Sequence, residues 1–131
     1  MTPALSGVKA DLTAVTLVTG ARASVREAAI AAALVPGRAT AVILEGLADA
    51  HSPLVQDDAA ALKVLRIAPG CLCCTGNLVL RVTLNRLLRH APAQLFISLA
   101  DAGHVEQLRG MLRAAPYDAL LALGPDLSAA T

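Results

Sequence analysis

The stretch Leu12–Thr19, Leu-Thr-Ala-Val-Thr-Leu-Val-Thr, decides the fold class of this 131-residue chain. Its unbroken run of apolar and β-branched residues ends at Gly20 and predicts a buried strand. Similar runs predict further strands at 40–44, 62–68, 94–99 and 117–123. Helical patterns alternate with them at 25–34, about 55–61, 78–90 and 102–114. The alternation predicts a three-layer α/β fold, with a mostly parallel five-stranded sheet and helices on both faces.

The composition indicates how such a core is built. Hydrophobic residues make up 56% of the chain but aromatic residues only 2%, so Ala, Val, Leu and Ile must fill the interior. The length fits one domain over residues 1–131, and we expect the small, polar tail 126–131 to be frayed.

The composition and net charge also disfavour nucleic acid and membrane as partners. A net charge of +1, with one Phe, one Tyr and no Trp, gives no basic footprint and no stacking platform for nucleic acid. No apolar run reaches the ~18 residues that a membrane span needs, and residues 1–11 do not read as a signal peptide. We therefore expect neither nucleic acid nor membrane as a partner.

All three cysteines of the chain lie within Pro69–Asn77, which reads Pro-Gly-Cys-Leu-Cys-Cys-Thr-Gly-Asn. The thiols of Cys71, Cys73 and Cys74 can converge on one soft metal ion if the backbone turns them inward. The alternative is that a cysteine here is only a small buried hydrophobe. An odd, clustered set without a spaced disulfide framework favours a reducing compartment, so the expected location is the cytoplasm.

Two segments should meet at one edge of the sheet. Gly20–Glu27 follows the first strand and Gly70–Gly76 follows the third, and ligands of parallel sheets bind at the carboxyl ends of strands. Each segment leads into a helix, whose positive N-terminal end lowers thiol pKa values and favours anions. Ser24 is expected to cap a helix that starts at Val25, with Glu27 completing a capping box.

The pattern resembles the nucleotide-binding domain of the CobW/HypB/UreG P-loop GTPases, specifically the CobW-like branch of metallochaperones. The resemblance rests on Gly70-Cys71-Leu72-Cys73-Cys74 opening a helix, and on the order of the predicted elements between about residues 12 and 123. It implies a P-loop NTPase-like fold that binds a thiophilic metal, with zinc expected, through Cys71, Cys73 and Cys74. It also implies GTP with magnesium as cofactors, and a client metalloprotein or a homo-oligomer as partner. The family's C-terminal CobW domain has no counterpart in these 131 residues.

The phosphate-binding loop departs from its pattern, G-x-x-x-x-G-K-[S/T]. Only Gly20 is kept. Val25 stands at the second glycine, Arg26 at the lysine, and Glu27 at the hydroxyl that ligates magnesium. Any nucleotide contact would come from Gly20, Ser24 and Arg26. A nucleotide hydrolase needs cradle, cation and metal together, so the sequence argues against GTP hydrolysis, and we assign no catalytic residue.

The family's acidic positions are altered as well. They fall near Gly46 and Ser98, with Glu45, Asp49 and Asp101 as neighbouring stand-ins. His104 follows the fourth strand, where it is either a fourth zinc ligand or a histidine at the start of a helix near solvent.

Three main functions remain open, and a thiol-redox role is a weaker fourth option, because adjacent cysteines such as Cys73 and Cys74 make a strained pairing. The first is a CobW-like domain that binds metal through its cysteines, with nucleotide binding weak or lost. The second is a GTPase that tolerates the altered loop, and the third is a protein-interaction module without either ligand.

Overall fold

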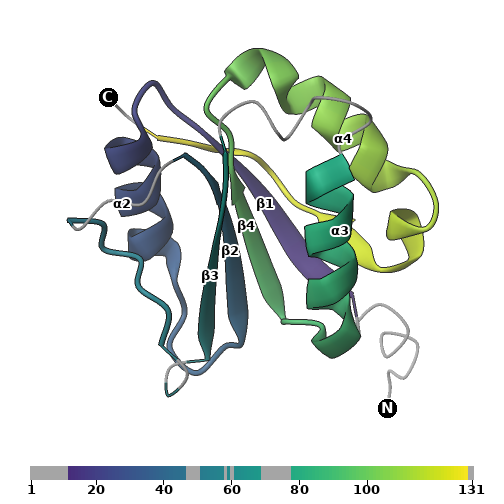
Figure 1. Ribbon diagram of the computed structural model, residues 1–131, viewed down its shortest axis with the longest axis horizontal. Coiled ribbons are helices and arrows are strands. Elements are labelled where there is room, and N and C mark those ends of the chain that lie inside the picture. Colours follow the sequence, from purple (N-terminus) through teal and green to yellow (C-terminus); the bar gives the residue numbers. More distant parts are fainter. Residues whose placement is uncertain (1–11, 47–50, 58, 60, 69–77, 130–131) are drawn as a thin grey trace.

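The computed structural model describes residues 12–46, 51–57, 59, 61–68 and 78–129 (Figure 1). The strands are β1 (Thr13–Thr19), β2 (Thr40–Glu45), β3 (Leu62–Ile67), β4 (Gln94–Ser98), β5 (Leu121–Leu123) and β6 (Leu127–Ser128). The α-helices are α2 (Ala23–Ala33), α3 (Leu78–Leu87) and α4 (Val105–Arg113). Short 3-10 turns are η2 (Leu88–His90), η3 (Ala102–His104) and η4 (Tyr117–Ala119).

The strands form one six-stranded sheet in the order β3-β2-β4-β1-β5, and β6 also pairs with β1. Every ladder is parallel. Strand β1 is central, because β4 pairs along one side of it while β5 and then β6 pair along the other. The predicted parallel α/β architecture is therefore confirmed, with one short strand more than expected.

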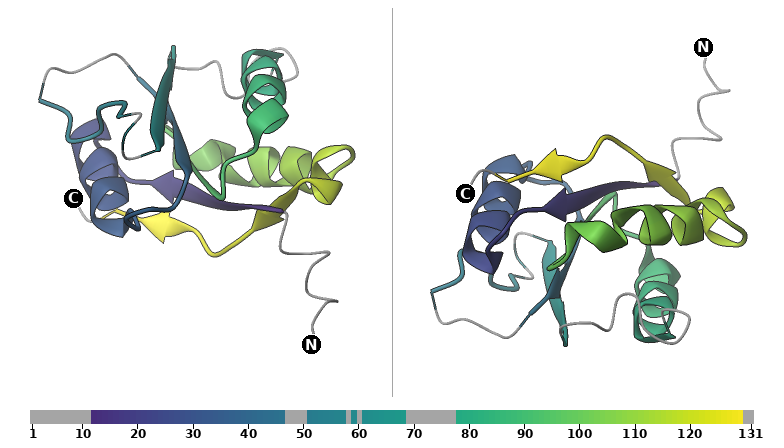
Figure 2. Two further views of the ribbon diagram at one scale, coloured as in Figure 1. Left: turned by 90° about the horizontal axis from the view of Figure 1, so that it is seen from below. Right: turned by 90° about the horizontal axis from the view of Figure 1, so that it is seen from above.

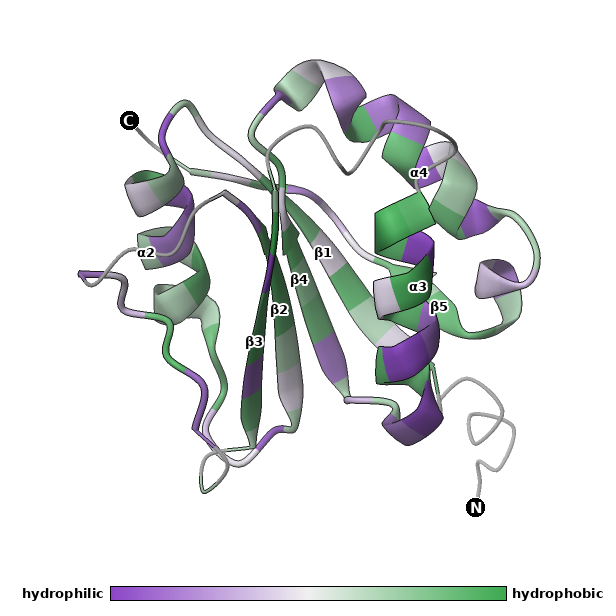
Figure 3. Ribbon diagram, in the orientation of Figure 1, coloured by the Kyte–Doolittle hydropathy of each residue, from purple (hydrophilic) through white to green (hydrophobic). Residues whose placement is uncertain are grey.

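Helices cover both faces of the sheet and produce three layers (Figure 2). Helix α2 lies on one face, where Ile30 packs with Val42 and Phe96. Helices α3 and α4 lie on the other face, where the buried leucines of α3 pack against β1 and β4. Hydrophobic residues follow the strands and the inward faces of the helices (Figure 3). No helix in the described part of the chain is long and apolar enough to cross a membrane.

Two local predictions on the first half of the chain are wrong. Helix α2 begins at Ala23 with Arg22 as its N-cap, and no side chain caps it, so Ser24 lies inside the first turn. The helix expected at about 55–61 is absent from the described residues of that range. There Asp57 exchanges two backbone hydrogen bonds of 2.9 Å with Leu62, which makes an antiparallel bridge.

The C-terminal segment is also more ordered than expected. The strand predicted at 117–123 is shortened to β5, because residues 117–119 form η4. Beyond it, Leu127 packs against the α2-side core and pairs with Val18, and the Ala129 N–H donates to the Thr19 carbonyl at 2.8 Å. The expectation of a frayed tail is therefore wrong for residues 126–129, since the open side of β1 supplies backbone partners.

Candidate ligand site at the carboxyl edge of the sheet

Strands β1, β2 and β4 end beside one another at the edge where ligands of parallel sheets bind. The site is built from the segment after β1, the ends of β2 and β4, and the first turns of α2. Four polar side chains are buried there, namely Arg26, Glu27, Glu45 and Ser98. Because a buried polar group is costly without a hydrogen-bond partner, their contacts show what holds this edge together.

Arg26, which the sequence comparison with the phosphate-loop pattern predicts to stand in place of the lysine, is turned into the protein. Its side chain is only 3% exposed. Nε donates to the Ser98 hydroxyl at 2.8 Å, and a terminal nitrogen donates to the Gly20 carbonyl at 2.8 Å. Burial lowers the pKa of Arg26, while the nearby carboxylates of Glu45 and Glu27 oppose this effect. The cation is thus used to join the ends of β1 and β4.

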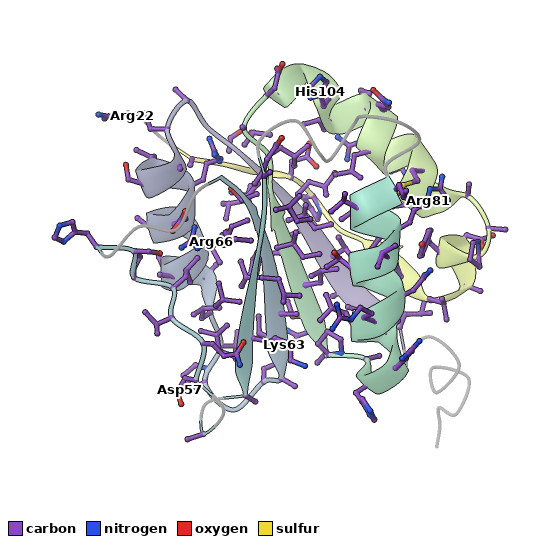
Figure 4. The ribbon with its side chains drawn as sticks, viewed as in Figure 1. Arg22, Asp57, Lys63, Arg66, Arg81 and His104 are labelled. Atoms are coloured by element: carbon purple, nitrogen blue, oxygen red, sulfur yellow. The ribbon has the colours of Figure 1, made fainter. Side chains whose placement is uncertain are left out.

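Glu27, predicted to stand in place of the magnesium-ligating hydroxyl, has partners from β3 and from residue 52. Its carboxylate faces the guanidinium of Arg66 on β3, with two N···O separations of 3.3 Å. The Ser52 hydroxyl donates to the same carboxylate. Figure 4 shows Arg66 lying between β3 and α2. A negative charge is therefore fixed where a nucleotide would bring its own negative phosphates.

The acidic residues that the sequence offered as possible magnesium ligands also have structural contacts. The carboxylate of Glu45 accepts a hydrogen bond of 2.8 Å from the Ala100 N–H, which joins the end of β2 to the segment after β4. Asp101 accepts 2.8 Å from the Gly103 N–H and is the N-cap of η3. Asp49 lies outside the described residues. Magnesium ligation by Glu45 or Asp101 would have to replace these contacts.

The segment between β1 and α2 is short. Only three residues separate β1 from α2, and the N–H groups of Val25 and Arg26 both donate to the Arg22 carbonyl at 3.1 Å. The amides of these two residues are thus used within the helix. Gly20 is also tightly packed: a Cβ there would lie 3.0 Å from the Ala129 Cβ and 3.1 Å from the Arg26 Cγ. This close approach accounts for its glycine without a nucleotide.

The three predicted metal ligands, Cys71, Cys73 and Cys74, lie outside the described residues. Across the described ranges, no three His, Cys, Asp or Glu side chains are grouped closely enough to hold a metal ion. His104 lies at the end of η3, with its Nε2 3.8 Å from a carboxylate oxygen of Asp101 (Figure 4). Its position after β4 agrees with the sequence prediction, and its role as a ligand stays a prediction.

Sequence reasoning missed the partners of Glu27. Arg66 was visible as one of two charged residues, with Lys63, in a strand of mainly apolar residues, and a charged residue there is a signal that a carboxylate partner lies nearby. Its partner could not be chosen from the sequence, since Glu27 is 39 residues away. The hydrogen bond between Arg26 and Ser98 joins residues 72 positions apart, so it could not be predicted from the sequence either.

The architecture places the protein in the class of α/β proteins with a P-loop NTPase-like, mostly parallel sheet. Among curated proteins, the chain is similar to the zinc chaperone YeiR of Escherichia coli (strain K12), with 39% identity over 66 residues. The match covers 50% of this chain and 20% of that protein. No protein-family model matches the chain, and no solved structure matches it.

Proposed function

We propose that the chain binds a thiophilic metal ion, zinc foremost, through Cys71, Cys73 and Cys74, and that its nucleotide binding is weak or lost. The proposal of metal binding, here called the metal half, is supported chiefly by the similarity to a zinc chaperone. It is also supported by the three cysteines, which form a Gly-Cys-X-Cys-Cys sequence. This motif and the alternation of elements also support membership of the CobW-like branch.

The cysteine set suits transfer of zinc better than permanent storage. Thiolate is a soft ligand that zinc prefers, and structural zinc sites in proteins usually close all four tetrahedral positions. Three cysteines leave one position for an incoming ligand, from a client metalloprotein or from His104. Zinc would then be cargo that the chain receives and delivers.

The nucleotide half rests on the internal contacts of Arg26 and Glu27. A phosphate would need the Arg26 guanidinium, which is already shared between Ser98 and Gly20. It would also approach Glu27, whose charge is compensated by Arg66 rather than by magnesium. Like charges brought together in a poorly solvated site repel strongly, so the folded protein opposes nucleotide binding.

The metal half is tested with reduced protein purified without added metal. Titration with Co(II) should give a thiolate-to-cobalt charge-transfer band, and zinc should remove it. The band should be lost when all three cysteines are replaced by serine, while His104→Ala should weaken it only if His104 is the fourth ligand. Equal metal uptake by the triple serine variant would refute the metal half.

The nucleotide half is tested by calorimetry with GTP and magnesium, alongside melting curves of the same samples. We expect no binding heat at high micromolar GTP and no rise in melting temperature, because a ligand that binds the folded state must stabilise it. A clear rise would favour a functional GTPase. Unchanged melting with both zinc and GTP would favour an interaction module without either ligand.

A further inference from the structure

A groove of about 480 Å³ lies between strand β3 and helix α3. Its apolar lining comes from Leu65, Ile67 and Leu87, whereas its polar lining is basic apart from Thr83. A second hollow of about 170 Å³ lies next to it and shares Lys63, Leu87 and His90 with it. Lys63 belongs to the β3 face that is turned toward α3, because it alternates in step with Leu65 and Ile67 (Figure 4).

The groove carries positive charge that has no carboxylate partner among the described residues. Lys63, Arg86, Arg89 and His90 line it, from β3 on one side and from the end of α3 and η2 on the other. Within the described residues, none of these four side chains has an ion pair with a carboxylate. Figure 3 shows the hydrophilic residues gathered at the C-terminal end of α3.

The positive charge of the groove is also visible in the sequence around it. The stretch 59–100 contains five Lys or Arg residues and no Asp or Glu, although the whole chain has a net charge of only +1. Cations near the end of a helix are stabilised by its dipole, which accounts for Arg86 and Arg89 in part. It does not account for Lys63, which comes from a strand and faces the same groove.

We propose that this groove binds an acidic peptide segment of a partner protein. Its carboxylates would lie on the cationic rim formed by Lys63, Arg86 and Arg89, and its apolar side chains would lie on the apolar lining. The combination of apolar and cationic surface favours such a segment over inorganic phosphate, which has nothing to place against leucine and isoleucine. It also disfavours single-stranded nucleic acid. The chain's two aromatic side chains, Phe96 and Tyr117, are buried in its cores and offer no base a stacking surface.

The groove proposal goes beyond metal binding and does not depend on it, because all the residues that carry it lie in β3, α3 and η2. It is tested with metal-free protein and a fluorescein-labelled peptide of alternating glutamate and leucine, followed by fluorescence anisotropy. A peptide with glutamine in place of glutamate and a labelled oligouridylate are the comparison probes. Binding should weaken as salt is raised, because the charges on the rim are exposed.

The decisive comparison is between two double variants with the same change in net charge. Lys63→Glu/Arg89→Glu should raise the peptide Kd by about tenfold, since two favourable exposed pairs become two unfavourable ones. Arg22→Glu/Arg38→Glu should change it by less than about twofold, because these arginines are exposed elsewhere and Arg22 points away from the groove (Figure 4). Lys63→Gln/Arg89→Gln should also raise the peptide Kd, but by less than the charge reversal.

Four outcomes of the peptide-binding measurements would overturn the groove proposal. They are no binding of the acidic peptide, equal binding of its glutamine counterpart, tighter binding of the oligouridylate, and equal losses in the two charge-reversed variants. Self-association of the free protein that the groove variant abolishes would also overturn it, because a second copy would then be the occupant.

Discussion

The side chains of Arg26 and Ser98 are joined by a hydrogen bond of 2.8 Å between Nε and the hydroxyl oxygen, at the edge where β1 and β4 end. Both residues stand where a P-loop pattern would place groups that handle nucleotide and magnesium. Here they stabilise the fold instead, together with the Gly20 carbonyl. These internal contacts satisfy the buried polar groups at this edge of the sheet without a ligand.

Replacing Arg26 with alanine should lower the free energy of unfolding by about 2–4 kcal/mol, because it leaves a cavity and removes donors from the Ser98 hydroxyl and the Gly20 carbonyl. Urea unfolding followed by circular dichroism measures the change. Arg22→Ala is the matched control, since Arg22 is exposed at the start of the same helix, and it should have little effect. A loss below about 1 kcal/mol would show that Arg26 is dispensable for the fold.

The contact between Glu27 and Arg66 can be isolated with a double-mutant cycle. Arg66→Leu alone should destabilise the protein by about 2–3 kcal/mol, because it leaves the Glu27 carboxylate buried without its cation. Glu27→Leu/Arg66→Leu should be less destabilised than Arg66→Leu, because removing both charges removes the uncompensated one. If the two single losses simply add in the double variant, the pair is not coupled.

The ion pair between Arg109 and Asp126 should make stability depend on pH at the acidic end. Arg109 donates to both carboxylate oxygens, at 2.9 Å and 2.7 Å, and these bonds lower the pKa of Asp126 below its usual value of about 3.9. The unfolded state therefore binds the proton more readily than the folded state. The stabilisation is complete above about pH 5 and is lost as the pH falls through the folded pKa.

Asp126→Asn should consequently be less stable than the wild type by about 0.5–1 kcal/mol at neutral pH, and the difference should shrink toward zero below about pH 3. Urea unfolding of both proteins at several pH values tests this. An equal difference at neutral and acidic pH would show that the charge of Asp126 does not contribute.

The hydroxyl of Tyr117 donates to the Asn85 side-chain oxygen at 3.0 Å and thereby joins η4 to α3. Tyr117→Phe should lower the free energy of unfolding by about 0.5–1.5 kcal/mol, which is the usual net value of one hydrogen bond. The ring remains in the core, so the change isolates the hydroxyl. If Asn85→Ala lowers stability further in the Tyr117→Phe background, Asn85 has a second role.

The long apolar strands and the helices between them could be predicted from the sequence, because their patterns are local. The runs at 12–19, 40–44 and 94–99 became β1, β2 and β4 with shifts of one residue at their ends. The predicted cap of α2 and the predicted helix near residue 57 were wrong: no side chain caps α2, and Asp57 forms a backbone bridge with Leu62 in place of a helical turn. Ser24 was displaced from the cap when the buried contacts of Arg26 and Glu27 set the start of the helix.

The sequence by itself determined the parallel α/β architecture, the cysteine cluster and the altered phosphate loop, since each is written in contiguous residues. The tertiary structure alone decided how Arg26, Glu27, Glu45 and Ser98 are satisfied, which residues line the cationic groove, and that residues 126–129 join the sheet edge. The physical reason is that hydrogen bonds and ion pairs between residues 39, 55 or 72 positions apart depend on the order of strands in the sheet. The residue periodicity within one segment contains no information about the order of the strands.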